Sequence, residues 1–151
     1  MSYNISTRSK RLLADTVTPV GIFLRIRDQY PYSVILESAD YHAMQNSFSY
    51  IACDVMASIT IDNSTVTQAF PNGETETFTL KNRKDAVKAL REFADAFKAE
   101  ENPHAFISNG LFGHITYDAV SYFEDIEMQG KSEETAIPQI MYRVYRLSLI
   151  Q

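Results

Sequence analysis

Between residues 48 and 80, short apolar segments alternate with turn-forming residues, and this pattern restricts the fold more than any other feature of the chain. Asp62-Asn63-Ser64 and Asn72-Gly73 are turn sequences, and Asn-Gly is typical of tight hairpins. Strands joined by such short turns pair in antiparallel fashion, because a parallel pair needs a long crossover connection. Four segments rich in β-branched and aromatic residues are predicted to be strands: Phe48–Cys53, Ala57–Ile61, Val66–Phe70 and Glu76–Leu80.

Three segments have the apolar spacing of helices that would cover this sheet. The first is expected to begin with Thr18 as its cap and to end before Pro31. The clearest is expected over Arg83–Glu100, with Asn82 as its cap, and a short third helix is capped by Asp118. The predicted apolar face of the long helix consists of Val87, Leu90, Phe93, Ala94 and Phe97. That of the short helix consists of Val120, Phe123 and Ile126.

Three further strands complete the prediction. The continuous Val-Ile-Leu run within Tyr32–Leu36 indicates a strand covered on both faces. Phe112–Tyr117 is expected to return to the sheet, and Ile137–Ile150 to form a long last strand after the polar loop Met128–Ala136. A chain of 151 residues is large enough for one core. The sequence therefore predicts an α+β fold, with an antiparallel β-sheet and covering helices, in a single domain over residues 1–151.

Charge and cysteine content narrow the classes of function. A net charge of −5, from 14 basic and 19 acidic residues, argues against electrostatic binding of nucleic acid. The longest apolar runs, such as Val34–Leu36, are too short to span a bilayer, so no membrane partner is expected. Arg8, Lys10 and Arg11 are not followed by the apolar core of a signal peptide. Cys53 stands alone, which favours a cytoplasmic protein without an intrachain disulfide.

No set of residues in the sequence predicts a catalytic or metal site. His42, His104 and His114 do not have metal-ligand spacing. Cys53 has no basic neighbour to lower its pKa, so burial as a small apolar residue is the expected role. Gly110 and Gly113 lack the Lys-Ser/Thr of a phosphate-binding loop; they instead allow positive φ or close approach of two backbones.

Five motifs follow one another along the chain: Leu12-Leu-Ala-Asp15, Leu36-Glu-Ser-Ala-Asp40, Phe48-Ser-Tyr-Ile-Ala-Cys-Asp54, Gly110–Glu124 and Ile137-Pro-Gln-Ile140. In this order they resemble the N-terminal part of anthranilate synthase component I, a family that uses chorismate to begin tryptophan biosynthesis. The resemblance covers most of residues 8 to 150. Ser47 departs from the family pattern, in which a basic residue is common at this position.

The resemblance implies a regulatory role without catalysis. It places Leu36, Glu37 and Ser38 in a pocket for the inhibitor tryptophan, although Ser38 alone could simply bond a turn. The catalytic half of the family, with its acid-base groups and magnesium ligands, is absent from these residues. A glutamine amidotransferase subunit is the implied partner, because it supplies ammonia to the full-length enzyme.

Two other readings remain open on the sequence alone. The chain also resembles aminodeoxychorismate synthase component I, a related enzyme of the folate pathway that can hold tryptophan in the same pocket. It could equally be a complete small ligand-binding or interaction module. If a catalytic half normally covers this domain, Ile137–Ile150 is expected to be an uncovered sheet edge, through which the fragment forms a symmetric homodimer.

Overall fold

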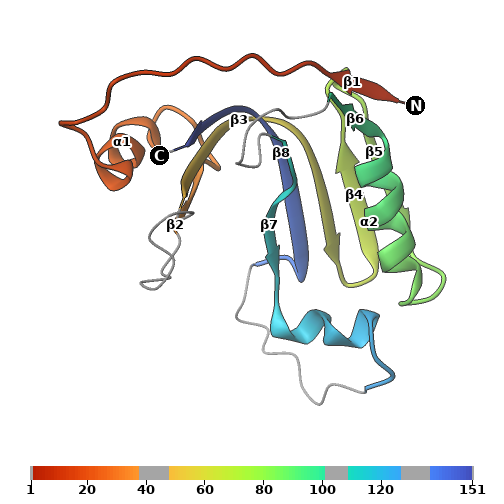
Figure 1. Ribbon diagram of the computed structural model, residues 1–151. Helices are drawn as coiled ribbons and strands as arrows, with labels where there is room; N and C mark the ends of the chain where they lie inside the picture. The colour runs from red at the N-terminus through yellow and green to blue at the C-terminus, as the bar shows by residue number, and fades with distance from the viewer. Residues whose placement is uncertain (1, 38–47, 101–108, 127–136, 151) are drawn as a thin grey trace.

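The computed structural model describes residues 2–37, 48–100, 109–126 and 137–150, which form two sheets, two α-helices and one 3₁₀ helix (Figure 1). The large sheet has six strands in the order β5-β4-β3-β8-β7, and β2 also pairs with β3. Every pair in this sheet is antiparallel, whereas β1 and β6 form a separate parallel pair. The elements are β1 (Tyr3–Ile5), α1 (Pro19–Ile26), β2 (Val34–Glu37), β3 (Ser49–Asp62), β4 (Thr65–Ala69), β5 (Thr75–Thr79), α2 (Asp85–Asp95), β6 (Phe97–Ala99), β7 (Phe112–Ile115), η1 (Tyr117–Tyr122) and β8 (Ile140–Ile150). The predicted α+β class is confirmed.

Strand β3 is one long strand, so the prediction of two strands over Phe48–Cys53 and Ala57–Ile61 was wrong. Asp54 has a left-handed backbone with φ 62°, and the pairing with β8 shifts between Val55 and Ala57. A bulge of this kind adds a residue to one strand and bends it while the ladder continues on both sides. The break in apolar alternation near residue 54 therefore marks a bend and not a turn.

Both predicted hairpins are present. The β3–β4 turn consists of Asn63 and Ser64, which have φ values of 48° and 64°. Positive φ at both central residues is the geometry of the tight turns that match the twist of paired strands. In the longer β4–β5 turn, Gly73 has φ 85°, and the Asn72 side chain accepts a hydrogen bond from the Glu74 backbone N–H.

The positive φ of Ser64 gives a stability prediction. A residue with a Cβ atom is strained in the left-handed region, whereas glycine is not. Ser64 makes two hydrogen bonds through its backbone: its N–H donates to the Tyr122 hydroxyl and its carbonyl accepts from the Leu80 N–H. We therefore expect Ser64→Gly to stabilise the protein by about 0.5–1 kcal/mol in urea unfolding. A lower unfolding midpoint than that of the wild type would contradict this turn geometry.

Helix α2 covers one face of the large sheet but is shorter than predicted. Its N-cap is Lys84 and not Asn82, and the chain leaves the helix at Ala96 to form β6 beside β1. Val87 is exposed, because the small residues of the helix allow closer approach to the sheet than its predicted large ones. The buried residues of α2 are Ala86, Ala89 and Phe93. They pack with Ala57, Ile59, Ile61, Val66, Leu80, Ala119, Tyr122, Ile140 and Val144 in the main core.

The short third helix also differs from its prediction. It is the 3₁₀ helix η1, whose N-cap residue is Thr116, and Asp118 lies in its first turn. Ala119 and Tyr122 are buried. The predicted apolar face is not the one that packs, because Phe123 and Ile126 are both exposed. The helix ends at Tyr122, so Phe123 and Ile126 lie beyond it, and the face that packs is one position earlier, at Ala119 and Tyr122, which are three residues apart as the 3₁₀ period requires.

At the other end of the large sheet, α1 and β2 lie beside β3 (Figure 1). Helix α1 begins as predicted: Pro19 is its first residue, and the Thr18 hydroxyl accepts a hydrogen bond of 3.0 Å from the Gly21 N–H. Strand β2 is not covered on both faces within the described residues, since its burial decreases along the strand and Leu36 is 49% exposed. That prediction was wrong: pairing with β3 uses one edge of β2, and among the described residues its faces are left exposed at Leu36 and Glu37.

Strand β8 pairs with β3 over most of its length and with β7 over residues 140–143. The predicted strand is confirmed over Ile140–Ile150, and the predicted uncovered edge is wrong for residues 140–143, which are paired on both sides. Among the described residues, 144–150 pair with β3 alone. The apolar composition of the strand reflects the burial of Ile140, Val144 and Tyr145. In the described part of the chain, no helix is long and apolar enough to cross a membrane.

Candidate functional site

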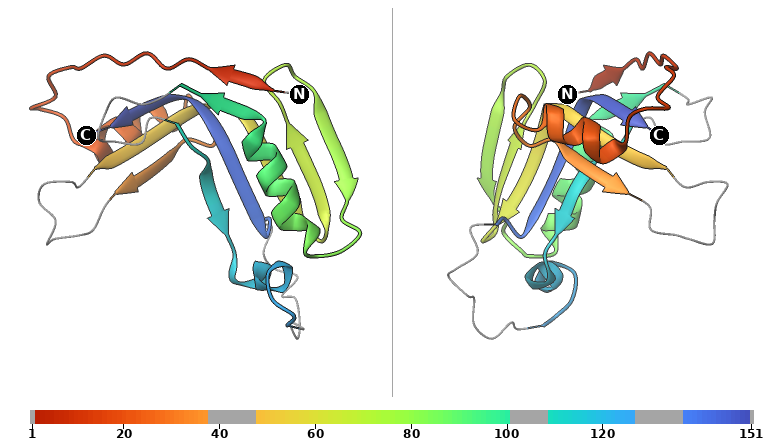
Figure 2. Two further views of the ribbon diagram at one scale, coloured as in Figure 1. Left: turned by 45° about the vertical axis from the view of Figure 1, so that its right-hand side comes forward. Right: turned by 90° about the vertical axis from the view of Figure 1, so that its left-hand side faces the viewer.

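The predicted effector residues lie where β2 ends. Leu36 pairs with Tyr50 and Glu37 pairs with Ser49, so both stand beside the beginning of β3. Both side chains are exposed. Ser38, the third predicted residue, lies outside the described residues. The structure therefore places two of the three next to the second sequence motif, at the end of the large sheet away from α2 (Figure 2).

An aromatic cluster connects this end of β2 to the other motifs. We use this name for Phe48, Tyr50, Phe112 and Tyr145. The Tyr50 ring centroid lies 6.4 Å from that of Phe48 and 6.5 Å from that of Phe112, and Phe112 lies 5.9 Å from Tyr145. Aromatic pairs at these separations stabilise the packing beyond the area they bury. Residues from two motifs and the last strand thus meet around one point, although they are far apart in the sequence.

Tyr145 anchors the cluster to the segment before β2. Its hydroxyl donates a 2.7 Å hydrogen bond to the Tyr32 carbonyl, and the Arg143 guanidinium lies 4.5 Å from the centroid of the Tyr32 ring. Burial raises the pKa of Tyr145, an effect that Arg143 opposes. A cation over an aromatic face is attracted by the ring, so Arg143 also holds Tyr32 in place. These contacts fix the start of β2 and hence the position of Leu36 and Glu37.

Below the cluster, the middle of β3 is closed to solvent. Ile51, Ala52 and Cys53 are each at most 2% exposed. Burial raises the pKa of the Cys53 thiol, and the neighbouring Asp54 carboxylate raises it further. A buried thiol with a raised pKa is a poor nucleophile, so the prediction that Cys53 is buried as a small apolar residue is confirmed. Asp54 itself forms an ion pair with Arg146, at 3.2 Å.

The described residues contain no group of three or more His, Cys, Asp or Glu side chains that could hold a metal ion. The Nε2 atom of His114 lies 3.1 Å from the Pro138 carbonyl oxygen, so this ring contacts the segment that leads into β8. Magnesium needs oxygen ligands in nearly octahedral geometry. The described side chains do not fit that requirement.

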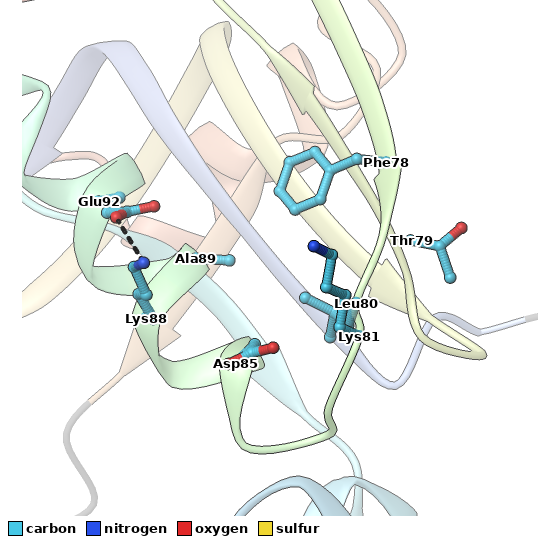
Figure 3. A pocket seen from close by; sticks show the side chains of 8 residues that line it. All are labelled: Phe78, Thr79, Leu80, Lys81, Asp85, Lys88, Ala89 and Glu92. Atoms are coloured by element: carbon cyan, nitrogen blue, oxygen red, sulfur yellow. Dashed lines mark ion pairs between the residues drawn. The ribbon is translucent and has the colours of Figure 1, made fainter.

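A shallow cleft lies at the opposite end of the large sheet, between β5 and α2 (Figure 3). Its volume is about 250 Å³, and it contains neither Leu36 nor Glu37. Lys88 and Glu92 line one wall and are 3.8 Å apart. This cleft was not predicted from the sequence, because the residues that line it come from a strand and a helix that were predicted separately. The lining residues are Phe78, Thr79, Leu80, Lys81, Asp85, Lys88, Ala89 and Glu92.

Comparisons with known proteins agree on one family, although no protein-family model matches the chain. The chain is 25% identical over 126 residues to anthranilate synthase component 1 of Aquifex aeolicus (strain VF5), covering 83% of this chain and 25% of that protein. It is 28% identical over 136 residues to anthranilate synthase component 1 of Thermus thermophilus, covering 88% of this chain and 27% of that protein. The chain resembles anthranilate synthase component I.

A solved structure supports the same fold. The crystal structure of anthranilate synthase component I from Streptococcus pneumoniae TIGR4 matches with a TM-score of 0.52 and 22% identity, covering 95% of this chain and 29% of that one. The resemblance predicted from the motifs is thus confirmed. The chain spans about a quarter of the length of the anthranilate synthase relatives it matches.

Proposed function

We propose that this chain is the N-terminal, effector-binding region of anthranilate synthase component I, and that it contributes to regulation and not to catalysis. The observation that carries the proposal is the convergence of the family motifs: Leu36 and Glu37 lie beside Tyr50, whose ring lies near Phe112. Relatives that share this stretch are named anthranilate synthase component 1. The full enzyme would make anthranilate from chorismate and ammonia in tryptophan biosynthesis, in the cytoplasm.

The proposed tryptophan site consists of Leu36, Glu37 and Ser38. Leu36 and Glu37 are successive residues of β2, so their exposed side chains point to opposite faces of the strand. Leu36 offers apolar surface to the indole ring on one face, and the Glu37 carboxylate, at the end of the strand, borders the site from the other. The Ser38 hydroxyl would supply a hydrogen bond. Because β2 is bonded to β3 and held through Tyr32 and Tyr145, a ligand at its end acts on a rigid frame.

Inhibition through this site requires two global states of the enzyme that tryptophan distinguishes. The aromatic cluster is the proposed link, because Tyr50, which pairs with Leu36 at the end of β2, is joined by ring contacts to Phe112 of β7 and through it to Tyr145 of β8. Acid-base catalysis and magnesium binding would belong to the remainder of the enzyme, since the described side chains do not fit a magnesium site. A glutamine amidotransferase component would supply the ammonia.

The related enzyme aminodeoxychorismate synthase component I is the alternative. The identity of the matched relatives favours the anthranilate branch, because those in Aquifex aeolicus, Synechocystis and Thermus thermophilus all carry the anthranilate synthase name. The relative from Synechocystis is 29% identical over 112 residues and covers 74% of this chain and 22% of that protein.

A direct assay tests the non-catalytic role. We expect the 151-residue chain to form no anthranilate from chorismate with magnesium and either ammonia or glutamine, measured by the fluorescence of anthranilate. The expectation rests on the lack of a metal-binding group among the described residues. Full-length component 1 of Thermus thermophilus, assayed with ammonia, is the positive control. Turnover by the chain above the enzyme-free rate would overturn the proposed division between regulation and catalysis.

A further inference from the structure

Strand β5 is an outer strand of the large sheet. In the part of the chain that the structure describes, it pairs with β4 alone, and Figure 2 shows it on the outside of the sheet. All five of its residues are exposed. Exposed strand edges present unpaired N–H and C=O groups that can pair with another strand. The edge of β5 is therefore a candidate interaction surface.

The hydrogen bonds at both ends of the β4–β5 hairpin show which backbone groups are free. The Phe70 N–H donates to the Glu74 carbonyl at 2.9 Å, and the Leu80 N–H donates to the Ser64 carbonyl at 2.8 Å. Directions alternate along an antiparallel strand, so the peptide groups of Glu76 and Phe78 also face β4. The N–H and C=O groups of Thr75, Thr77 and Thr79 consequently point outward.

We propose that two copies of this chain pair through β5 in antiparallel fashion, about a two-fold axis at Thr77. Thr77 then exchanges both hydrogen bonds with Thr77 of the second copy, and Thr75 does so with Thr79. This register uses every outward-pointing backbone group of the strand and closes after two copies. The two large sheets become one continuous sheet.

Side chains on both faces are compatible with this register. On one face, the threonines of β5 lie in line with Thr67 of β4, whose hydroxyl is 3.5 Å from that of Thr77. On the other face, Glu76 stands opposite Phe78 of the second copy, so the two Glu76 carboxylates are not directly opposed. Phe78 is 42% exposed beside the cleft of Figure 3.

Charge favours a second copy as the occupant of this edge. The acidic residues of the hairpin, Glu74 and Glu76, precede or lie in β5, whereas Lys81, Arg83 and Lys84 follow it. Lys88 of the cleft is paired with Glu92 and adds no net charge. Antiparallel pairing brings the acidic end of one strand to the basic end of the other, twice in each dimer. Complementary charges of this kind fix the register of an interface and suppress wrong pairings.

This proposal does not depend on the proposed function. It assigns a homodimer to β5, whereas the homodimer predicted from the sequence used Ile137–Ile150, of which residues 140–143 are paired on both sides. Pairing of five residues gives a small interface, below the roughly 1,200 Å² of a standard stable complex. The association is therefore weak, and it is to be tested at protein concentrations from about 10 µM to 1 mM.

Hydrogen exchange at single amides, followed by NMR, gives the sharpest test. The amides of Thr75, Thr77 and Thr79 should exchange more slowly as the protein concentration rises. Those of Glu76 and Phe78 are already bonded to β4, so they serve as internal controls whose exchange is independent of concentration. Unchanged exchange at the three threonines up to about 1 mM would overturn the proposal.

Two substitutions at Thr77 form a matched pair. Thr77→Pro removes an outward N–H without breaking a bond to β4, and proline is tolerated on edge strands. It should abolish concentration-dependent sedimentation, whereas Thr77→Ala should retain it. Equal association of wild type and Thr77→Pro would overturn the proposal.

Glu76→Lys keeps the backbone intact and tests the charge arrangement. It should weaken association about tenfold or more, because a basic residue then stands at the acidic end of each strand, which meets the basic end of the other copy. Unchanged association in this variant would also contradict the register.

Discussion

Replacement of Gly113 by alanine is expected to destabilise the protein by about 3 kcal/mol or more. Gly113 lies in β7 opposite Tyr142 of β8. A Cβ atom at this position would lie 1.8 Å from the Met141 carbonyl oxygen and 2.8 Å from the Tyr142 Cα atom. These are backbone atoms of a strand bonded on both sides, so a change of rotamer cannot relieve the overlap. The cost must instead appear as displacement of β7.

Gly73→Ala is the matched control. Gly73 has φ 85° in the β4–β5 turn, but a Cβ atom there would meet nothing within 4 Å. The change therefore introduces only backbone strain, of about 1 kcal/mol. Urea unfolding of both variants compares steric overlap with strain alone. If Gly113→Ala loses no more stability than Gly73→Ala, the close approach of β7 to β8 is contradicted.

Gly113 also shows which features of the fold could be predicted from the sequence. Its residue type predicted either positive φ or close approach of two backbones, and the structure shows the close approach. The two hairpins were predictable for the same reason, because Asn63-Ser64 and Asn72-Gly73 impose local backbone geometry. Local rules of this kind work where one or two residues determine the conformation.

The predictions that were wrong concern residues whose structure depends on contacts with segments far away in the sequence. Phe97 fits the apolar spacing of α2, yet it lies in β6, where its backbone pairs with Tyr3 and its ring lies 5.5 Å from the Tyr3 ring. Nothing local to residues 3–5 predicted a strand. Similarly, the apolar pattern of β8 shows that the strand is buried but not whether it lies at an edge or inside the sheet. Of the candidate site, the motifs predicted that Leu36 and Glu37 belong to it, while the ring contact that joins Tyr50 of β3 to Phe112 of β7 depends on the tertiary fold.

The second substitution from which we expect a large effect is at Ser38, where the effect is on inhibition by tryptophan. If its hydroxyl bonds tryptophan in a site that excludes water, Ser38→Ala leaves a polar group of the ligand unpaired. Such a loss costs about 1–3 kcal/mol, or about five- to hundred-fold in affinity. In the full-length enzyme, Ser38→Ala and Ser38→Phe should therefore relieve inhibition by tryptophan without lowering the uninhibited rate. Unchanged inhibition curves in both variants would remove Ser38 from the site.

Ser121→Ala is a suitable control for this experiment. Ser121 lies in η1, where its hydroxyl donates to the Asp118 carbonyl, and Figure 1 places η1 away from β2. It removes the same atom as Ser38→Ala from a distant part of the fold. Inhibition by tryptophan should be unaffected. A loss of inhibition in Ser121→Ala as large as in Ser38→Ala would indicate a general effect on stability and not a contact with the ligand.

Binding of tryptophan by Leu36, Glu37 and Ser38 can be measured through the fluorescence of the ligand itself. The chain contains no tryptophan residue, so emission excited at wavelengths that tyrosine does not absorb reports only the added amino acid. We predict a saturable change in this emission when the 151-residue chain is titrated into tryptophan, with affinity about five- to hundred-fold weaker for Ser38→Ala. No saturable change with the wild type would contradict binding of tryptophan by this chain, and equal affinities for the two proteins would contradict the role of Ser38.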